Sequence, residues 1–87
     1  SMSIGDFNSL DLNSKVDYLW SNGEVGFSKI VSLGSKYAVM VFKVDDFHAT
    51  LIHNRDSKEY VNCEGMIGVP KTLTVEDQNI QVETWDS

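Results

Sequence analysis

The residues of this chain best suited to hold a metal ion are Asp46, His48 and Cys63. If strands at residues 47–53 and 58–63 pair through a turn at residues 54–57, Cys63 lies opposite His48. Asp46 lies two residues before His48. A zinc site needs three or four ligands at about 2.0–2.3 Å. No Cys-x2-Cys or His-x3-His pair is present to complete such a set. We therefore expect no bound metal and no cofactor.

Cys63 is also the candidate nucleophile, with His48 as its base. Such a pair needs a third group that orients the base, and no Asn or Asp is placed to do so. The adjacent carboxylates of Asp45 and Asp46 indicate a solvated turn rather than an acid/base pair. We therefore expect a protein that is not an enzyme. The alternative is a small-molecule or metal-binding module, or a minimal enzyme, that uses the sheet face of His48 and Cys63.

The strand that must position these groups is YAVMVFKV, residues 37–44, which has apolar side chains on both faces. A half-buried strand alternates apolar with polar residues. Two apolar faces are typical of a central strand that is covered on both sides. Turn signals rich in Gly, Asp, Asn and Ser divide this part of the chain. They predict strands over residues 26–33, 37–44, 47–53 and 58–63, with a turn at Gly34-Ser35.

A helix is predicted over residues 12–21, because apolar residues recur at i, i+4, i+7 and i+8. Asp11 is the expected N-cap. Asn22-Gly23 is the expected left-handed stop. The apolar face that should pack on the sheet consists of Leu12, Val16, Leu19 and Trp20.

These patterns predict a single α+β domain over residues 1–87, with one N-terminal helix packed on a four- to five-stranded antiparallel β-meander. The meander is expected over residues 26–63. Residues 1–9 form a flexible or extended lead, with Ile4 and Phe7 as anchors. Residues 64–87 form a loop, with a short helical turn at 74–77, and a C-terminal edge strand at 80–85.

The segment DLNSKVDYLWSNG, residues 11–23, resembles a pattern in small uncharacterised proteins of the Bacteroidetes group. In those proteins a short helix ends in an aromatic residue, an aliphatic residue, Trp and then Gly, and a β-meander follows. Tyr18, Leu19, Trp20 and Gly23 carry the likeness here. The resemblance implies a helix-plus-sheet fold, and it implies no activity.

The net charge is −6, from 13 acidic and 7 basic residues. Such a surface repels phosphate backbones, which argues against direct binding of nucleic acid. No apolar run approaches the roughly 18 residues of a membrane span. Cys63 is the only cysteine, so the chain has no internal disulfide. These features are typical of the cytoplasm, where thiols stay reduced.

We therefore expect a small acidic protein-binding domain of bacterial or phage origin, similar in class to immunity proteins and phage-encoded inhibitors. Its partner would be a protein with a basic surface, or a second copy in a homodimer. The second sheet face is then covered by residues 66–85, by a second copy or by another protein. The residues expected to contact a partner are apolar or aromatic, namely Ile30, Tyr37, Val39, Val41, Ile52 and Trp85, or acidic, namely Asp45, Asp46, Glu76, Asp77, Glu83 and Asp86.

Overall fold

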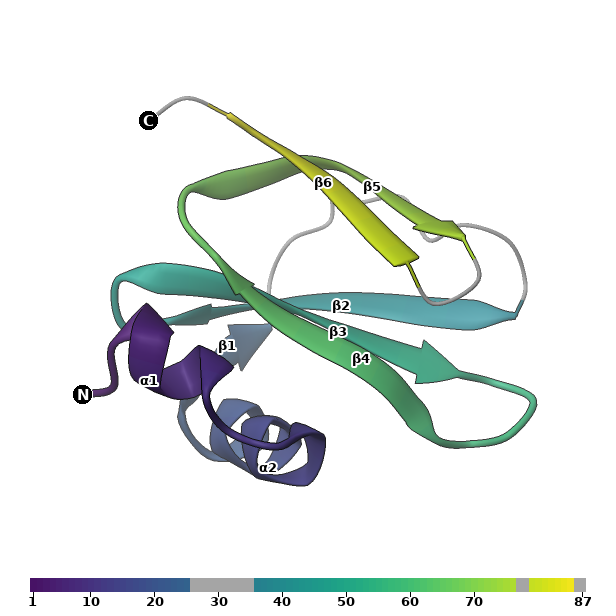
Figure 1. Cartoon of the computed structure of the whole chain (residues 1–87), viewed down its shortest axis with the longest axis horizontal. Helices are drawn as coiled ribbons and strands as arrows, with labels where there is room; N and C mark the ends of the chain where they lie inside the picture. The colour runs from purple at the N-terminus through teal and green to yellow at the C-terminus, as the bar shows by residue number, and fades with distance from the viewer. Residues whose placement is uncertain (26–35, 77–78, 86–87) are drawn as a thin grey trace.

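The computed structural model describes residues 1–25, 36–76 and 79–85. Strands β1–β4 form one antiparallel sheet in sequence order, and β5 and β6 form a second, two-stranded sheet. Helices α1 and α2 lie on one face of the first sheet, and the β5–β6 hairpin lies across the other (Figure 1). This confirms the α+β class. The elements are α1 Ile4–Asn8, α2 Leu12–Asn22, β1 Glu24–Val25, β2 Tyr37–Val44, β3 Phe47–Asn54, β4 Tyr60–Met66, β5 Val69–Glu76 and β6 Asn79–Trp85.

Residues 4–8, expected as part of a flexible or extended lead, form helix α1 instead. The Ser3 side chain caps this helix by accepting a hydrogen bond from the N–H of Asp6 at 3.1 Å. Phe7 is fully buried, and its ring centroid lies 5.3 Å from that of Phe47. The helix is therefore held by tertiary packing, because five residues are too few to be stable alone. The predicted anchoring role of Phe7 is confirmed.

Helix α2 begins where the sequence predicts, since Asp11 accepts a hydrogen bond from the N–H of Ser14 at 2.8 Å. Its end differs from the prediction. Gly23 has φ −93° and ψ 157°, which is extended backbone, so the expected left-handed stop is wrong. Glycine is required there because a Cβ would lie 2.8 Å from the Leu19 carbonyl oxygen and 3.0 Å from Cδ2 of Phe42.

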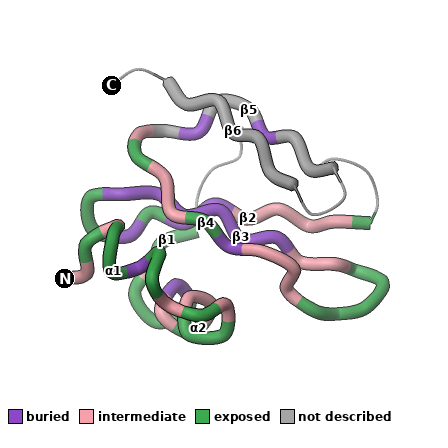
Figure 2. Tube along the Cα trace, in the orientation of Figure 1, coloured by how far each residue is buried: buried purple, intermediate pink, exposed green. Residues whose placement is uncertain are grey.

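The main core lies between the helices and the sheet, on the face predicted to receive the helix. Burying each large apolar side chain in it contributes about 1.5–3 kcal/mol. The tube in Figure 2 shows the buried stretches concentrated in β2 and β3, between the helices and the hairpin. The buried residues of this cluster are Phe7, Leu19, Phe42, Val44, Phe47, Ala49, Leu51 and Cys63.

A β-bulge in β4 changes the expected register. His53 pairs with Tyr60 while Ile52 pairs with Asn62, so Val61 is an extra residue. One extra residue moves every following side chain to the other face of the sheet. Cys63 therefore pairs with Leu51 on the helix-side face. The prediction that Cys63 shares a face with His48 is wrong.

The chain after Cys63 is more regular than predicted. Strand β4 continues through Gly65, and β5 starts at Val69. The predicted helical turn at 74–77 is wrong where the structure describes it, because residues 74–76 belong to β5. Pro70 is accommodated beside an irregularity in the β5–β6 pairing, where a missing N–H is tolerated. The predicted strand at 80–85 is confirmed as β6.

The predicted strand at 37–44 is confirmed with the same bounds as β2, and that at 47–53 is β3, one residue longer. Strand β1 was not predicted. It pairs Glu24 with Lys43 and Val25 with Phe42, next to the end of β2. The strand predicted over 26–33 and the turn at Gly34-Ser35 lie outside the described residues.

Candidate functional site

The apolar residues expected to contact a partner lie on the hairpin side of the sheet. Val41 and Ile52 are only 2% and 0% exposed. Tyr37 and Val39 are half-buried, and Ile30 lies outside the described residues. Leu73 of β5 is also buried, and the hairpin crosses this face (Figure 1). The chain itself therefore covers the centre of the expected patch.

The acidic residues expected to contact a partner are dispersed. Asp46 is exposed in the turn between β2 and β3, which confirms that turn. Glu76 ends β5, and Glu83 and Trp85 belong to β6. Asp77 and Asp86 lie outside the described residues. Of the members whose side chains the structure describes, Asp45 and Asp46 are exposed in the turn after β2, whereas Val41 and Ile52 are buried.

Asp45, at the same turn, has a structural role. Its Oδ2 accepts hydrogen bonds from the N–H of Met2 at 3.0 Å and from the hydroxyl of Tyr18 at 3.2 Å. Desolvation, followed by the nearby Asp45 charge, raises the pKa of Tyr18. Asp45 has φ +48°, a conformation that Asp tolerates well. It thus ties the N-terminal segment and α2 to the sheet.

His48 and Cys63 do not form a site together, because they lie on opposite faces of the sheet. Cys63 is 1% exposed, and burial raises the pKa of its thiol to about 12. A thiol with this pKa is a poor nucleophile. The described residues contain no group of three or more His, Cys, Asp or Glu side chains that could hold a metal ion. The shared face assumed for the metal-binding or enzymatic alternative is therefore not present.

Trp20, predicted as part of the buried helix stripe, is 52% exposed. Its ring stands edge-on to Phe42, with centroids 5.0 Å apart and planes at 84°. Val25 is 55% exposed, and it pairs with Phe42, so it belongs to the same helix-side face. Two large apolar side chains thus flank Phe42 and still face solvent.

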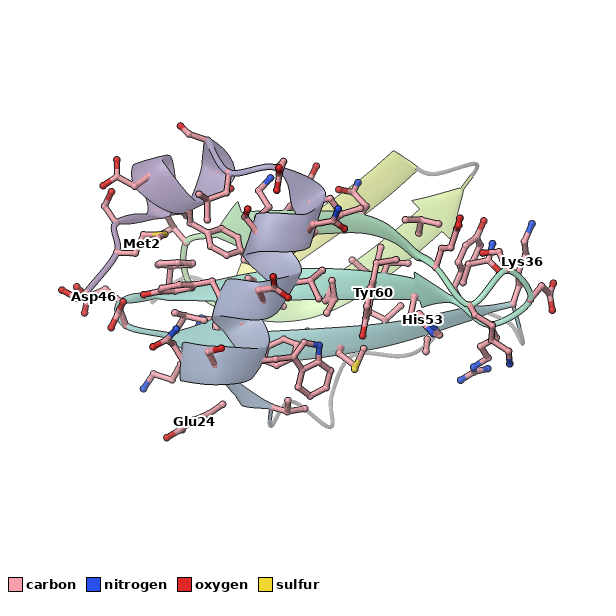
Figure 3. All side chains as sticks on the ribbon, turned by 90° about the horizontal axis from the view of Figure 1, so that it is seen from below. Met2, Glu24, Lys36, Asp46, His53 and Tyr60 are labelled. Carbon is pink, nitrogen blue, oxygen red and sulfur yellow. The ribbon has the colours of Figure 1, made fainter. Side chains whose placement is uncertain are left out.

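Partly exposed side chains continue this face along β2, β3 and β4. Met40 precedes Phe42 by two residues on the same strand face, and it is only half-buried. His53 and Tyr60 are half-buried as well, and their ring centroids lie 5.0 Å apart. Figure 3 shows His53 and Tyr60 beside α2, toward the end of the sheet that carries Lys36. We call Trp20, Val25, Met40, His53 and Tyr60 the Trp20 strip.

Exposed charged residues gather at both ends of the sheet. Figure 3 places Asp46 at one end and Lys36 at the other. The backbone N–H of Arg55 donates to the Lys36 carbonyl oxygen at 2.8 Å, which holds two basic residues together. Lys43 pairs with Glu24 at the first end, and Asp56 and Glu59 are exposed beside Arg55 and Lys58 at the second, so both ends carry charges of both signs.

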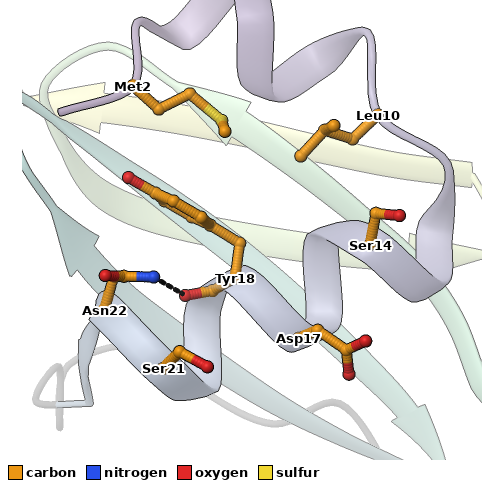
Figure 4. Close-up of a pocket in the computed structure, with 7 residues that line it drawn as sticks. All are labelled: Met2, Leu10, Ser14, Asp17, Tyr18, Ser21 and Asn22. Carbon is orange, nitrogen blue, oxygen red and sulfur yellow. Dashed lines mark hydrogen bonds between the residues drawn. The ribbon is translucent and has the colours of Figure 1, made fainter.

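A shallow groove separates the N-terminal segment from α2. Its volume is about 400 Å³, and it is lined by Met2, Leu10, Ser14, Asp17, Tyr18, Ser21 and Asn22. Figure 4 shows Met2, Leu10 and Tyr18 pointing toward one another, while Asp17 points away. Asn22 donates a hydrogen bond to the Tyr18 carbonyl oxygen at 3.1 Å. The groove therefore lacks the converging polar groups that orient a small ligand.

No protein-family model, curated protein or solved structure matches this chain. Neither helix in the described ranges has both the length and the hydropathy needed to cross a membrane. The candidate site therefore stands on its geometry alone. Within the described residues, the Trp20 strip places exposed Trp and Val side chains on either side of a buried aromatic ring, and exposed apolar groups of this kind are typical of binding surfaces.

Proposed function

We propose that this chain is a small non-enzymatic protein-binding domain and that its partner docks on the Trp20 strip. The observation that carries the proposal is the exposure of Trp20 and Val25 on either side of the buried Phe42 ring. Trp is enriched among residues that dominate binding energy, because it offers a large rigid surface. Here α2 and β1 hold Trp20 and Val25 in place, so docking orders few flexible groups.

Charge supports a partner with a basic surface. The net charge of −6 raises the rate of encounter with a cationic protein and lowers that with an anionic one. Glu24 adjoins Val25 in β1, so an acidic group borders the strip directly. We place the protein in the cytoplasm, where the buried Cys63 stays a thiol.

The test is a photo-crosslinking experiment in cells of the native host. A benzophenone amino acid at position 25 should form an adduct with a protein. The same amino acid at position 64 is the control, because Glu64 is exposed and pairs with Thr50 on the hairpin-side face. The adduct at position 25 should disappear when Trp20→Ala is added, and it should persist with Ser21→Ala.

The identified partner would then be purified and its affinity measured. Trp20→Ala should weaken binding by more than about tenfold, as loss of a central interface aromatic does. Ser21→Ala should leave binding unchanged, because Ser21 is an exposed neighbour on the same helix. No protein adduct at position 25 above the level at position 64 would overturn the proposed function.

A further inference from the structure

We infer that strand β4 carries a strand-pairing edge that helix α1 and the Asn62 side chain hold closed. The inference goes beyond the proposed function, because it concerns the outer edge of β4 and not the Trp20 strip. The strand order β1-β2-β3-β4 places β4 at the border of its sheet. A border strand offers backbone N–H and C=O groups to another extended chain, so β4 can pair with a strand of another molecule unless those groups are occupied.

The pairing of β4 with β3 shows which of its donors point outward. In an antiparallel pair, residues that exchange hydrogen bonds with the opposite strand alternate with residues that direct their N–H and C=O away from it. The N–H of Gly65 donates to Asn8 Oδ1 of α1 at 3.1 Å, so Gly65, which lies opposite Ala49, is of the outward kind. Cys63 lies two residues earlier in the same register, opposite Leu51, and is therefore of the same kind.

An asparagine side chain occupies each of these two donors. Asn8 Oδ1 accepts from the N–H of Gly65, and Asn62 Oδ1 accepts from the N–H of Cys63 at 2.7 Å. A side-chain amide oxygen is an acceptor of the same kind as a backbone carbonyl oxygen. The two side chains thus replace the carbonyl groups that a further strand would supply, and an approaching strand must displace both of them.

The closure of the edge depends on the packing of α1. Asn8 is the last residue of this five-residue helix, which is too short to persist on its own. Phe7 anchors the helix, because its side chain is fully buried and its ring centroid lies 5.3 Å from that of Phe47. The N–H of Met2 adds a tie by donating to Asp45 Oδ2 at 3.0 Å. The edge therefore stays closed while α1 remains docked, and it opens when α1 leaves the sheet.

The molecule thus inhibits strand addition at its own sheet. Once both asparagine oxygens are removed, the N–H groups of Cys63 and Gly65 can donate to the backbone carbonyl groups of another copy. The net charge of −6 opposes close contact between copies. Strand pairing between copies therefore requires an open edge together with salt that screens this charge.

The first test is amide hydrogen exchange of the purified full chain, followed by NMR. Asn8→Ala should speed exchange of the Gly65 amide by about two- to tenfold, as expected for the loss of one hydrogen bond. Asn62→Ala should do the same for the Cys63 amide. Each variant should leave the other amide unchanged, which separates the loss of one cap from general destabilisation.

Two control variants accompany this test. Asn8→Asp should preserve the wild-type exchange rate of the Gly65 amide, because a carboxylate oxygen also accepts from its N–H. Asn13→Ala, at an exposed position of α2, should change the exchange rate of neither Gly65 nor Cys63.

The second test is sedimentation equilibrium of the double variant Asn8→Ala/Asn62→Ala in about 1 M salt, where the Debye length is about 3 Å. The double variant should associate more tightly than wild type, with a dissociation constant lower by more than about tenfold. The difference should persist when Trp20→Ala is added to both proteins, because the edge and the Trp20 strip are separate surfaces. Circular dichroism verifies the fold of each variant. Should the double variant fail to fold, the exchange rates of the single variants still decide whether the asparagines close the edge.

The outcomes separate this inference from the proposed function. Unchanged exchange of Gly65 in Asn8→Ala and of Cys63 in Asn62→Ala would overturn the inference, because neither side chain would then close the edge. A folded double variant that associates no more than wild type would overturn the strand-pairing role of β4. Association that disappeared with Trp20→Ala would do the same, because it would assign the contact to the Trp20 strip. None of these results depends on the adduct at position 25, which tests the proposed function.

Discussion

Single polar side chains hold α1, α2 and the turn between β2 and β3 in place. The Ser3 and Asp11 side chains accept hydrogen bonds from backbone N–H groups three residues later, so each satisfies a donor at its own helix start. Asp45 instead accepts from Met2 and Tyr18, which are distant in sequence. The Asp11 carboxylate thus caps its own helix, whereas the Asp45 carboxylate links segments that are far apart in the sequence.

The N-cap predicts a pH dependence of stability. The hydrogen bond from the Ser14 N–H lowers the pKa of Asp11 below its ordinary value of 3.8. The folded-state pKa lies below the unfolded one, so the stabilisation is complete above pH 3.8 and is lost as the pH falls through the folded-state value. Asp11→Ala should therefore lower Tm at neutral pH, and its difference from wild type should shrink in acid.

The measurement is thermal unfolding followed by circular dichroism at a series of pH values. Asp11→Asn is the matched control, because Asn also caps helices but does not titrate. The difference in Tm between Asp11→Asn and Asp11→Ala should therefore not shrink in this way. A difference between wild type and Asp11→Ala that stayed constant down to strongly acidic pH would contradict this account of the cap.

Side chains of helix α1 pack closely on the backbone of strand β4 at Gly65. Asn8 Oδ1 accepts a hydrogen bond from the N–H of Gly65 at 3.1 Å, which satisfies a donor at the edge of the sheet. A Cβ at residue 65 would lie 2.9 Å from this oxygen and 3.1 Å from Cγ1 of Ile4. Gly65 therefore permits contact rather than breaking the strand. This contact covers an edge that would otherwise expose unpaired backbone groups.

Gly65→Ala should displace α1 and destabilise the protein by about 1–3 kcal/mol, as overpacking does. Gly5→Ala is the matched control, because a Cβ there meets only Ser3 Oγ at 3.9 Å. Since Ala is the better helix former, Gly5→Ala should leave stability unchanged or raise it. Urea unfolding of both variants provides the comparison, and equal midpoints would show that α1 does not pack this closely on β4.

The whole molecule encloses apolar side chains on both faces of its sheet. The helices cover Phe42, Val44 and Leu51 on one side. Val41, Thr50 and Ile52 are buried on the other, where the hairpin crosses the sheet (Figure 1). Beside the helices on the first side, Trp20 and Val25 remain 52% and 55% exposed. Among the described residues, the Trp20 strip is therefore an apolar surface available to a partner.

Deletion of residues 79–87 tests the cover of the second face. Loss of β6 leaves β5 without its partner strand and exposes the side of the sheet that carries Val41 and Ile52. Exposed apolar patches of this kind promote association. The truncated protein should unfold at lower urea concentration and aggregate, even in the Trp20→Ala background. Deletion of residues 86–87 alone, which leaves β6 intact, is the control.

Unchanged stability and solubility after the longer deletion would show that the hairpin does not protect this face. Aggregation that disappeared with Trp20→Ala would assign the effect to the Trp20 strip instead. The two surfaces lie on opposite faces of the sheet, so the two variants can be combined without direct contact between the altered sites.

Local signals in the sequence determined the parts of this fold that depend on neighbouring residues. The Asp11 cap, the apolar spacing of α2, the continuous apolar run of β2 and the strand pattern of β6 all act within a few residues, so their bounds could be predicted closely. The two-sided burial of β2 also followed from its composition. The α+β class could be predicted for the same reason.

Only the tertiary structure decided which surfaces stay open. The bulge at Val61 moves Cys63 to the helix side, and no local signal marks that single extra residue. Trp20 continues the apolar stripe of α2, but it is exposed because the helix covers only part of the sheet. The hairpin covers the face first expected to bind a partner. Each of these outcomes depends on contacts between segments far apart in the chain, and short-range sequence patterns do not encode such contacts.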